Sequence, residues 1–144
     1  MHKKHKYDIL VIMAVFGFAV SLYLAISHYM NFSVPCTVTK GCETVLSSKY
    51  AYFLGLPLSV WGCVYFVSVI ITALMANHYK VWRYLLTYLV GVGALCSLVF
   101  LSIQFFVIKK VCQYCLTVDL LSIVIFLIDI NIVRTEHEPI LPPA

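Results

Sequence analysis

Four long apolar runs constrain this chain more than any other feature. Short polar segments separate them, and each run approaches or exceeds the roughly 20 residues that an α-helix needs to span a bilayer. The predicted helices cover about residues 9–29, 57–76, 84–108 and 112–133. Only 11% of the residues are charged, against about 25% in a typical soluble domain. We therefore expect an all-α membrane protein, a bundle of four transmembrane helices.

The largest polar connection, residues 31–56, lies between the first two runs and is expected to form a large loop. The first run is longer than the apolar core of a signal peptide, so we interpret it as a retained helix. The last residues, 134–144, are rich in proline and are expected to form a disordered cytoplasmic tail. Residues 1–133 thus form one four-helix domain in this interpretation.

Basic residues near the helix ends predict the orientation, because they gather on the cytoplasmic side of a membrane. Six lie on one side and four on the other, respectively Lys3, Lys4, Lys6, Lys80, Arg83 and Arg134, and Lys40, Lys49, Lys109 and Lys110. This bias predicts a multi-pass protein of the inner (cell) membrane with both termini in the cytoplasm. The connection 31–56 and the start of the last helix then share the extracytoplasmic side. The net charge of +4 therefore indicates membrane orientation and not nucleic-acid binding.

A C-x-x-C motif, Cys112-Gln113-Tyr114-Cys115, stands at the start of the fourth run. The first turn of a helix exposes unpaired N–H groups and a partial positive charge, which stabilise a thiolate. The thiolate is the reactive form in disulfide exchange. The motif predicts a redox-active dithiol at a membrane surface; a structural disulfide or half of a zinc site are the alternatives.

A second cysteine pair, Cys36 and Cys42, lies in the connection between the first two helices. Alone it would be read as a structural staple, but beside an outward-facing C-x-x-C it is a plausible electron shuttle. The four thiolates together could instead form a tetrahedral zinc site. Cys63 and Cys96 lie inside apolar runs and are expected to pack as small hydrophobic residues.

Asp119 is the most informative polar residue within a predicted span. It follows Cys115 by four residues, hence lies on the same helix face, and is on the order of 10 Å deeper than Cys112. Because a charged carboxylate inside a membrane is costly, Asp119 is either a proton relay or substrate contact, or the partner of Gln104, a tyrosine or a serine on a neighbouring helix. Spacing alone does not choose between Ser47 and Ser48.

The order of these motifs resembles the vitamin K epoxide reductase family. The resemblance rests on Cys36-x5-Cys42, on Glu43-Thr44-Val45-Leu46-Ser47-Ser48, on Phe53-Leu54-Gly55-Leu56-Pro57-Leu58-Ser59-Val60-Trp61-Gly62 and on Cys112-x-x-Cys115. It extends over roughly residues 9–133. It implies a four-helix transmembrane bundle that encloses a quinone.

The resemblance also implies roles for individual residues. Cys112 and Cys115 are the active-site pair, with Cys115 facing the quinone ring. Cys42 exchanges with Cys112, and Cys36 meets an external thiol. Ser48 falls at the family's loop serine, so Ser48, Asp119 and Cys115 are the expected quinone contacts.

Two departures bear on the substrate. Animal epoxide reductases carry a Thr-Tyr-Ala segment where this chain has Thr117-Val118-Asp119-Leu120, and Leu58 replaces an asparagine of those enzymes. Both favour a bacterial or archaeal type, which oxidises a thioredoxin-fold, DsbA-like partner and reduces ubiquinone or menaquinone. The partner is expected to be a separate protein. The alternatives are a vitamin K epoxide or quinone reductase, and a zinc-binding or structural membrane protein.

Overall fold

The computed structural model describes residues 2–31, 33–37 and 41–137, and helices dominate it. The long helices are α1 (His2–Tyr29), α3 (Leu58–Ala76), α4 (Lys80–Ser102) and α5 (Gln113–His137). With the continuation of α4 included, all four are long and apolar enough to cross a membrane. The prediction of a mostly helical chain with four candidate spans is confirmed.

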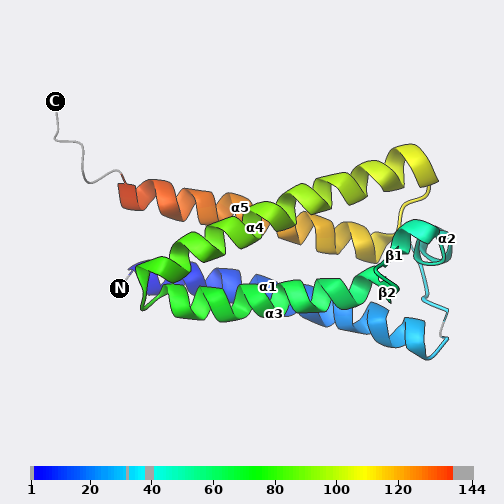
Figure 1. Cartoon of the computed structure of the whole chain (residues 1–144), viewed down its shortest axis with the longest axis horizontal. Helices are drawn as coiled ribbons and strands as arrows, with labels where there is room; N and C mark the ends of the chain where they lie inside the picture. Colours follow the sequence, from blue (N-terminus) through cyan, green and yellow to red (C-terminus); the bar gives the residue numbers. More distant parts are fainter. Residues whose placement is uncertain (1, 32, 38–40, 138–144) are drawn as a thin grey trace.

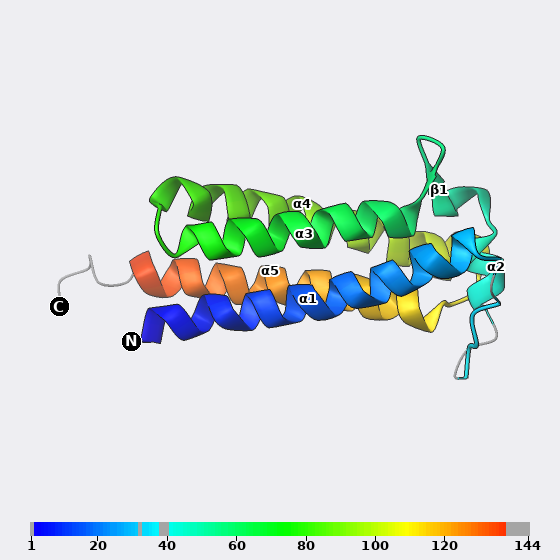
Figure 2. The same ribbon diagram turned by 90° about the horizontal axis from the view of Figure 1, so that it is seen from below.

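The four helices lie side by side in an elongated bundle (Figure 1, Figure 2). α1 packs against α3 and α5, and α4 packs against the same two helices. α1 begins and α5 ends at one end of the bundle. The short helix α2 (Cys42–Leu46) lies at the other end, beside the connection that leads into α5.

The interior of the bundle is apolar and tightly packed around Phe66 of α3. A Cβ atom at Gly17 would come within 2.5 Å of the Phe66 ring, so glycine allows α1 to approach α3 closely at this level. The fully buried apolar side chains of this core include Leu10, Ala14, Phe66, Val69, Ala73, Leu86, Val90 and Ile125. Large apolar side chains such as Ile12 and Tyr88 are exposed on the outer surface, as expected for helices that face lipid.

The segment between α1 and α3 contains several short elements. They are α2, the 3₁₀ turn η1 (Lys49–Ala51), and the strands β1 (Tyr52–Phe53) and β2 (Leu56–Pro57). The strands pair antiparallel across a two-residue turn, in which Leu54 and Gly55 have φ values of 54° and 79°. Positive φ at both positions is typical of a tight hairpin turn. The Trp61 indole N–H donates to the Phe53 carbonyl at 3.1 Å, which ties the hairpin to α3.

α4 does not end as an α-helix. It continues as a π-helical segment, η2 (Ile103–Ile108), which ends at Lys109 in the left-handed conformation with φ of 54°. The sequence predicted one regular helix over residues 84–108, so the π segment is a departure from that prediction.

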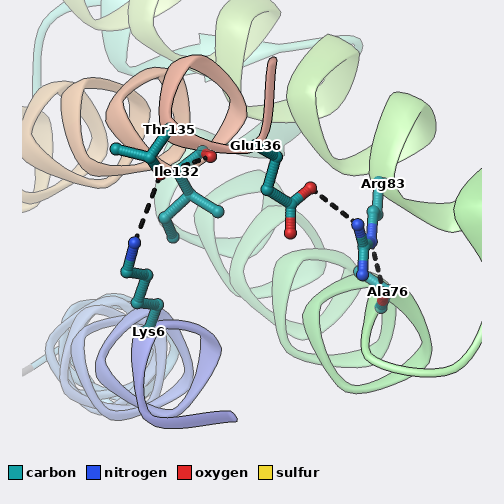
Figure 3. A network of polar contacts seen from close by, with 6 residues as sticks. All are labelled: Lys6, Ala76, Arg83, Ile132, Thr135 and Glu136. Atoms are coloured by element: carbon teal, nitrogen blue, oxygen red, sulfur yellow. Dashed lines mark hydrogen bonds and ion pairs between the residues drawn. The ribbon is translucent and has the colours of Figure 1, made fainter. Parts of the chain in front are cut away.

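A polar network joins the helices at the end remote from α2 (Figure 3). The Arg83 guanidinium forms an ion pair with Glu136 at 2.6 Å and donates to the Ala76 carbonyl at 3.1 Å. The Lys6 ammonium donates to the Thr135 hydroxyl at 3.2 Å. These contacts connect α1, α4 and α5 with the last residue of α3.

The same contacts explain where the predicted helix ends were wrong. α5 continues through His137, so residues 134–137 are helical and not part of a disordered tail; residues 138–144 lie outside the described residues. α1 likewise begins at His2 instead of residue 9, and α4 at Lys80 instead of residue 84. Apolarity marks only the part of a helix that faces hydrocarbon, whereas polar contacts extend the helices beyond it.

Candidate functional site

The two cysteines of the segment between α1 and α3 form a disulfide, with 6.2 Å between the Cα atoms of Cys36 and Cys42. Cys42 is the first residue of α2 and is 1% exposed, while Cys36 lies in an irregular segment and is half-buried. Gly41 allows the burial of Cys42, because a Cβ there would lie 2.8 Å from the Val111 carbonyl oxygen. Cys36 is therefore the more accessible sulfur of the disulfide.

Cys112 immediately precedes α5 and Cys115 lies in its first turn. Both are free thiols; Cys112 is fully buried and Cys115 is half-buried. The Cys115 N–H donates to the Cys112 sulfur at 3.4 Å, and the Leu116 N–H donates to the Cys112 carbonyl at 2.8 Å. Cys112 thus occupies the position of a helix cap, where its sulfur accepts one of the unpaired N–H groups of the first turn.

This environment favours the thiolate of Cys112. The pKa of Cys112 is lowered to about 7, chiefly because the Cys115 side chain donates a hydrogen bond to its sulfur. Burial opposes this effect, and the backbone N–H groups of Cys115 and Tyr114 add to it. At neutral pH the thiolate fraction of Cys112 is therefore larger than that of an unperturbed cysteine.

The two cysteine pairs meet at one end of the bundle. Cys42, Val45 and Cys112 form one buried cluster, and Cys36 and Cys115 pack against it. The four sulfurs are one disulfide and two thiols. Among the described residues, no group of three or more histidine, cysteine or acidic side chains is arranged to hold a metal ion.

Tyr114, between the two cysteines of the C-x-x-C motif, contacts the segment that carries the other pair. Its hydroxyl donates to the Pro35 carbonyl at 3.1 Å, directly before Cys36. Its ring lies against that of Tyr23 on α1, with 5.7 Å between centroids. The C-x-x-C motif is thereby attached to the disulfide-bearing segment by a hydrogen bond as well as by packing.

Asp119 is buried one turn beyond Cys115, with 7% exposure. The Gln104 side-chain N–H donates to the Asp119 carboxylate at 3.4 Å, and the Ser97 hydroxyl lies beside the same group. Gln104 was among the partners that the sequence offered for Asp119. The second bond of Gln104 was not predicted: its oxygen accepts the Cys112 backbone N–H at 3.2 Å.

A cavity of about 790 Å³ opens beside the cysteines. Its wall is mostly apolar and is formed by all four long helices together with α2, η1, the hairpin and η2, which contributes Gln104. Cys115 and Asp119 line it, whereas Cys36, Cys42 and Cys112 do not. Its volume lies within the range of about 300–1,000 Å³ that is usual for small-molecule sites.

The structure brings both candidate serines to this cavity. Ser48 is half-buried and donates to the Val45 carbonyl at 2.7 Å; Ser47 is exposed and donates to the Glu43 carbonyl at 2.6 Å. Leu58, which replaces an asparagine of the animal epoxide reductases, also lines the cavity.

Sequence reasoning did not select a further polar pair in the cavity wall. The Ser122 hydroxyl donates to the Tyr65 hydroxyl at 2.9 Å, and both residues line the cavity. Ser122 could have been found, since it follows Asp119 by three residues and hence shares its helix face. Tyr65 offered no such signal, because it lies among apolar residues of α3.

Residues 9–130 match the sequence model described as "Vitamin K epoxide reductase family". The chain belongs to the vitamin K epoxide reductase family. The match includes all four cysteines of the site, Ser48 and Asp119, and it extends from α1 to α5. Vitamin K epoxide reductases are membrane oxidoreductases of thiols and quinones. The four candidate spans, the cysteine disulfide and the apolar cavity agree with membership of this family.

Proposed function

We propose that this member of the vitamin K epoxide reductase family is a quinone-dependent thiol oxidoreductase that generates disulfides. Its substrate is a separate thioredoxin-fold, DsbA-like protein, which it reoxidises. The observation that carries the proposal is the contact between the two cysteine pairs, of which one sulfur, Cys115, opens onto the cavity. Such an arrangement accepts electrons at one place and releases them at another.

The cavity suits a quinone of the ubiquinone or menaquinone (vitamin K) type. A quinone presents a flat ring, two carbonyl oxygens and a long apolar tail, and the wall offers a large apolar surface with the Cys115 thiol, the Asp119 carboxyl group and the Ser48 hydroxyl. When bound, a quinone supplies the acceptor for two electrons and two protons. A DsbA-type partner is itself strongly oxidising, so its reoxidation needs an acceptor of higher potential, such as a quinone.

Electrons enter at the disulfide between α1 and α3. A thiolate of the reduced partner attacks the Cys36 sulfur, the more accessible one, and Cys42 leaves as a thiolate. The second thiol of the partner then closes the partner's own disulfide and releases Cys36. The partner has lost two electrons and two protons, and Cys36 and Cys42 have gained them.

The second exchange passes the electrons to the motif at the start of α5. The Cys42 thiolate attacks the Cys112 sulfur of the Cys112–Cys115 disulfide, and Cys115 leaves. Cys36 then closes the bond to Cys42 and releases Cys112. After this transfer Cys36 and Cys42 again form a disulfide, and Cys112 and Cys115 are a dithiol.

In the last step Cys112 and Cys115 close their disulfide again and give up two electrons and two protons, which convert a quinone to a quinol. Cys115 lies at the cavity wall and makes the transfer, while the neighbouring Cys112 takes up the bond. Asp119 lies one turn deeper, where a buried carboxyl group can hold or pass on a proton. Ser48, which also lines the cavity, provides a further polar contact for the quinone.

We also propose that the cysteines face the extracytoplasmic side of the inner membrane. Arg83 and Lys6 lie at the end where α1 begins and α5 ends, which the distribution of basic residues assigns to the cytoplasm. The opposite end, with α2, would then face an oxidising compartment in which disulfides persist. This orientation gives a soluble partner direct access to Cys36.

The assignment is tested with purified protein, a small dithiol and a menaquinone analogue. Cys115→Ala should lower the rate of quinone reduction by about a thousandfold or more, because the sulfur that transfers the electrons is removed. Cys63→Ala, a cysteine of α3 outside the cavity wall, is the matched control and should retain the activity. Full activity of Cys115→Ala refutes the assignment. The same assay with vitamin K epoxide identifies an epoxide reductase.

A second substitution tests the carboxyl group. Asp119→Asn keeps the shape of the side chain but removes its proton exchange, and we expect quinone reduction to slow by about tenfold. Asp129→Asn is the control, since Asp129 is buried on α5 but does not line the cavity. Equal losses in the two variants would contradict a role of Asp119 at the cavity.

A further inference from the structure

We propose that Gln104 is a positioning residue. It fixes the position of Cys112, the cysteine that exchanges with Cys42, relative to the Asp119 carboxyl group at the cavity wall. The inference rests on the proposed function for its chemistry. Gln104 lies outside the cysteine and serine motifs, lines the cavity wall, and uses both ends of its amide on Cys112 and Asp119, so it acts through these two residues.

Two hydrogen bonds fix the orientation of the Gln104 side-chain amide. Its oxygen can only accept and takes the Cys112 N–H at 3.2 Å; its nitrogen can only donate and points to the Asp119 carboxylate at 3.4 Å. Gln104 is 4% exposed, so water does not readily replace either bond. Exchanging the two amide atoms would place donor against donor at Cys112, which fixes the orientation of the side chain.

The backbone of η2 brings Gln104 to this place. A π-helical segment is wider than an α-helix and is frequently found at functional sites. Here it is followed by the left-handed Lys109, after which the chain turns back to Cys112. Gln104 on η2 thereby faces Cys112, eight residues further along the chain and directly before α5.

These contacts hold Cys112 from two sides. Its sulfur accepts the Cys115 N–H, and its own N–H, which no turn of α5 can pair, is bonded to Gln104. The other end of the Gln104 amide holds Asp119, one turn beyond Cys115. Loss of Gln104 would leave a buried N–H and a buried carboxyl group without these partners, and both are costly.

The step that Gln104 serves is the last one of the proposed reaction. Cys112 and Cys115 lose two electrons and two protons and close their disulfide, and a quinone becomes a quinol. Gln104 gains and loses no atom in this step. Its contribution is the geometry in which Cys112 lies beside Cys115 while Asp119 stays at the cavity wall.

The experiment uses Gln104→Met, which keeps the length of the side chain and removes both hydrogen bonds. The parent protein carries Cys36→Ser, Cys42→Ser and Cys96→Ala, so that Cys112 and Cys115 are the cysteine pair that remains at the cavity. Two quantities are measured on the reduced protein. One is the rate at which N-ethylmaleimide alkylates each remaining cysteine, followed by mass spectrometry. The other is the single-turnover rate of reduction of a menaquinone analogue.

We expect alkylation of Cys112 to accelerate about fivefold and quinone reduction to slow about tenfold, since each lost hydrogen bond to a buried group is worth about a factor of ten. Alkylation of Cys63 should stay unchanged and serves as the internal reference for the fold. Ser102→Ala is the matched control, because Ser102 is exposed and bonds only the Leu98 carbonyl of its own helix among the contacts described; it should match the parent in both rates.

Two results overturn the proposal. One is an unchanged alkylation rate of Cys112; the other is an equal acceleration at Cys112 and Cys63, which would mean general loosening of the bundle. If Gln104→Met does not fold, Gln104→Leu replaces it. That variant also lacks both hydrogen bonds, so faster alkylation of Cys112 with an unchanged rate at Cys63 supports the proposal, and a parental alkylation rate of Cys112 overturns it. A parent that reduces no quinone refutes the proposed function, while the alkylation rates still test Gln104.

Discussion

The two cysteine pairs of this protein meet at one end of the bundle but are built in opposite ways. Cys36 and Cys42 lie on a segment of short elements, and one of the two sulfurs is accessible. Cys112 and Cys115 lie at the start of a long helix, where hydrogen bonds from Cys115 and to Gln104 hold them. The Cys36–Cys42 pair is therefore accessible to a partner protein, whereas hydrogen bonds fix the position of the Cys112/Cys115 pair.

The difference teaches why a membrane oxidoreductase uses two pairs. A protein substrate needs an exposed sulfur on a segment that can adapt to its surface. A quinone needs a sulfur at a fixed place beside an apolar cavity, away from competing thiols. A single pair in either setting would serve one of the two substrates poorly, and disulfide exchange between the pairs connects them at little cost in free energy.

Among the changes that separate the roles of the two pairs, the largest effect should come from removing the accessible pair. With a DsbA-like protein as the electron donor, Cys36→Ser or Cys42→Ser should lower quinone reduction by about a hundredfold or more, because the first exchange has no acceptor. With a small dithiol, which can enter the cavity and reach Cys115 at its wall, the same variants should retain at least about half of the activity. Both rates are measured by the loss of quinone absorbance. Equal losses of activity with the two donors would contradict separate roles for the two cysteine pairs.

The environment of Cys112 should determine the pH dependence of its reactivity. Because the pKa of Cys112 is lowered to about 7, its thiolate persists below the usual range and is lost only as the pH falls through about 7. The rate of Cys112 alkylation by iodoacetamide should therefore rise to half of its maximum near pH 7. In the unfolded chain the same cysteine should titrate at about 8.5. A folded-state midpoint above that value would contradict the environment described for Cys112.

A smaller effect is expected at the contact between the two regions. Tyr114→Phe removes the hydroxyl that donates to the Pro35 carbonyl and leaves the ring in place. A single exposed hydrogen bond is worth little, so we expect quinone reduction driven by a DsbA-like protein to slow about threefold. Reduction driven by a small dithiol should not change. A slower rate with the small dithiol would show that the hydroxyl acts on the helix pair itself.

The sequence predicted those features that depend on residues close in the chain. The four spans follow from apolar runs, and the place of Cys112 and Cys115 follows from a motif at the start of such a run. That Cys115 and Asp119 lie on the same face of the helix follows from their spacing of four residues. Each of these inferences needs only the helical repeat and the thickness of a bilayer.

The remaining features depend on specific side-chain contacts. The extension of α5 through Glu136 depends on Arg83, which is 53 residues earlier in the chain. The π segment that carries Gln104 and the hairpin at Gly55 are held by contacts with Cys112 and Trp61, which no hydrophobic repeat encodes. No local pattern announces them. The cavity is of the same kind, since its wall combines side chains from every long helix.

The most direct test of the account is the bond that links the two pairs. In the variant Cys36→Ser/Cys115→Ser, one cysteine of each pair remains, Cys42 and Cys112, and both residues belong to one buried cluster. After mild oxidation, mass spectrometry of the digested protein should find a Cys42–Cys112 disulfide within one chain as the main product. If both cysteines instead remain thiols, or if Cys42→Ser/Cys115→Ser forms a Cys36–Cys112 bond just as readily, the proposed electron route between the pairs is contradicted.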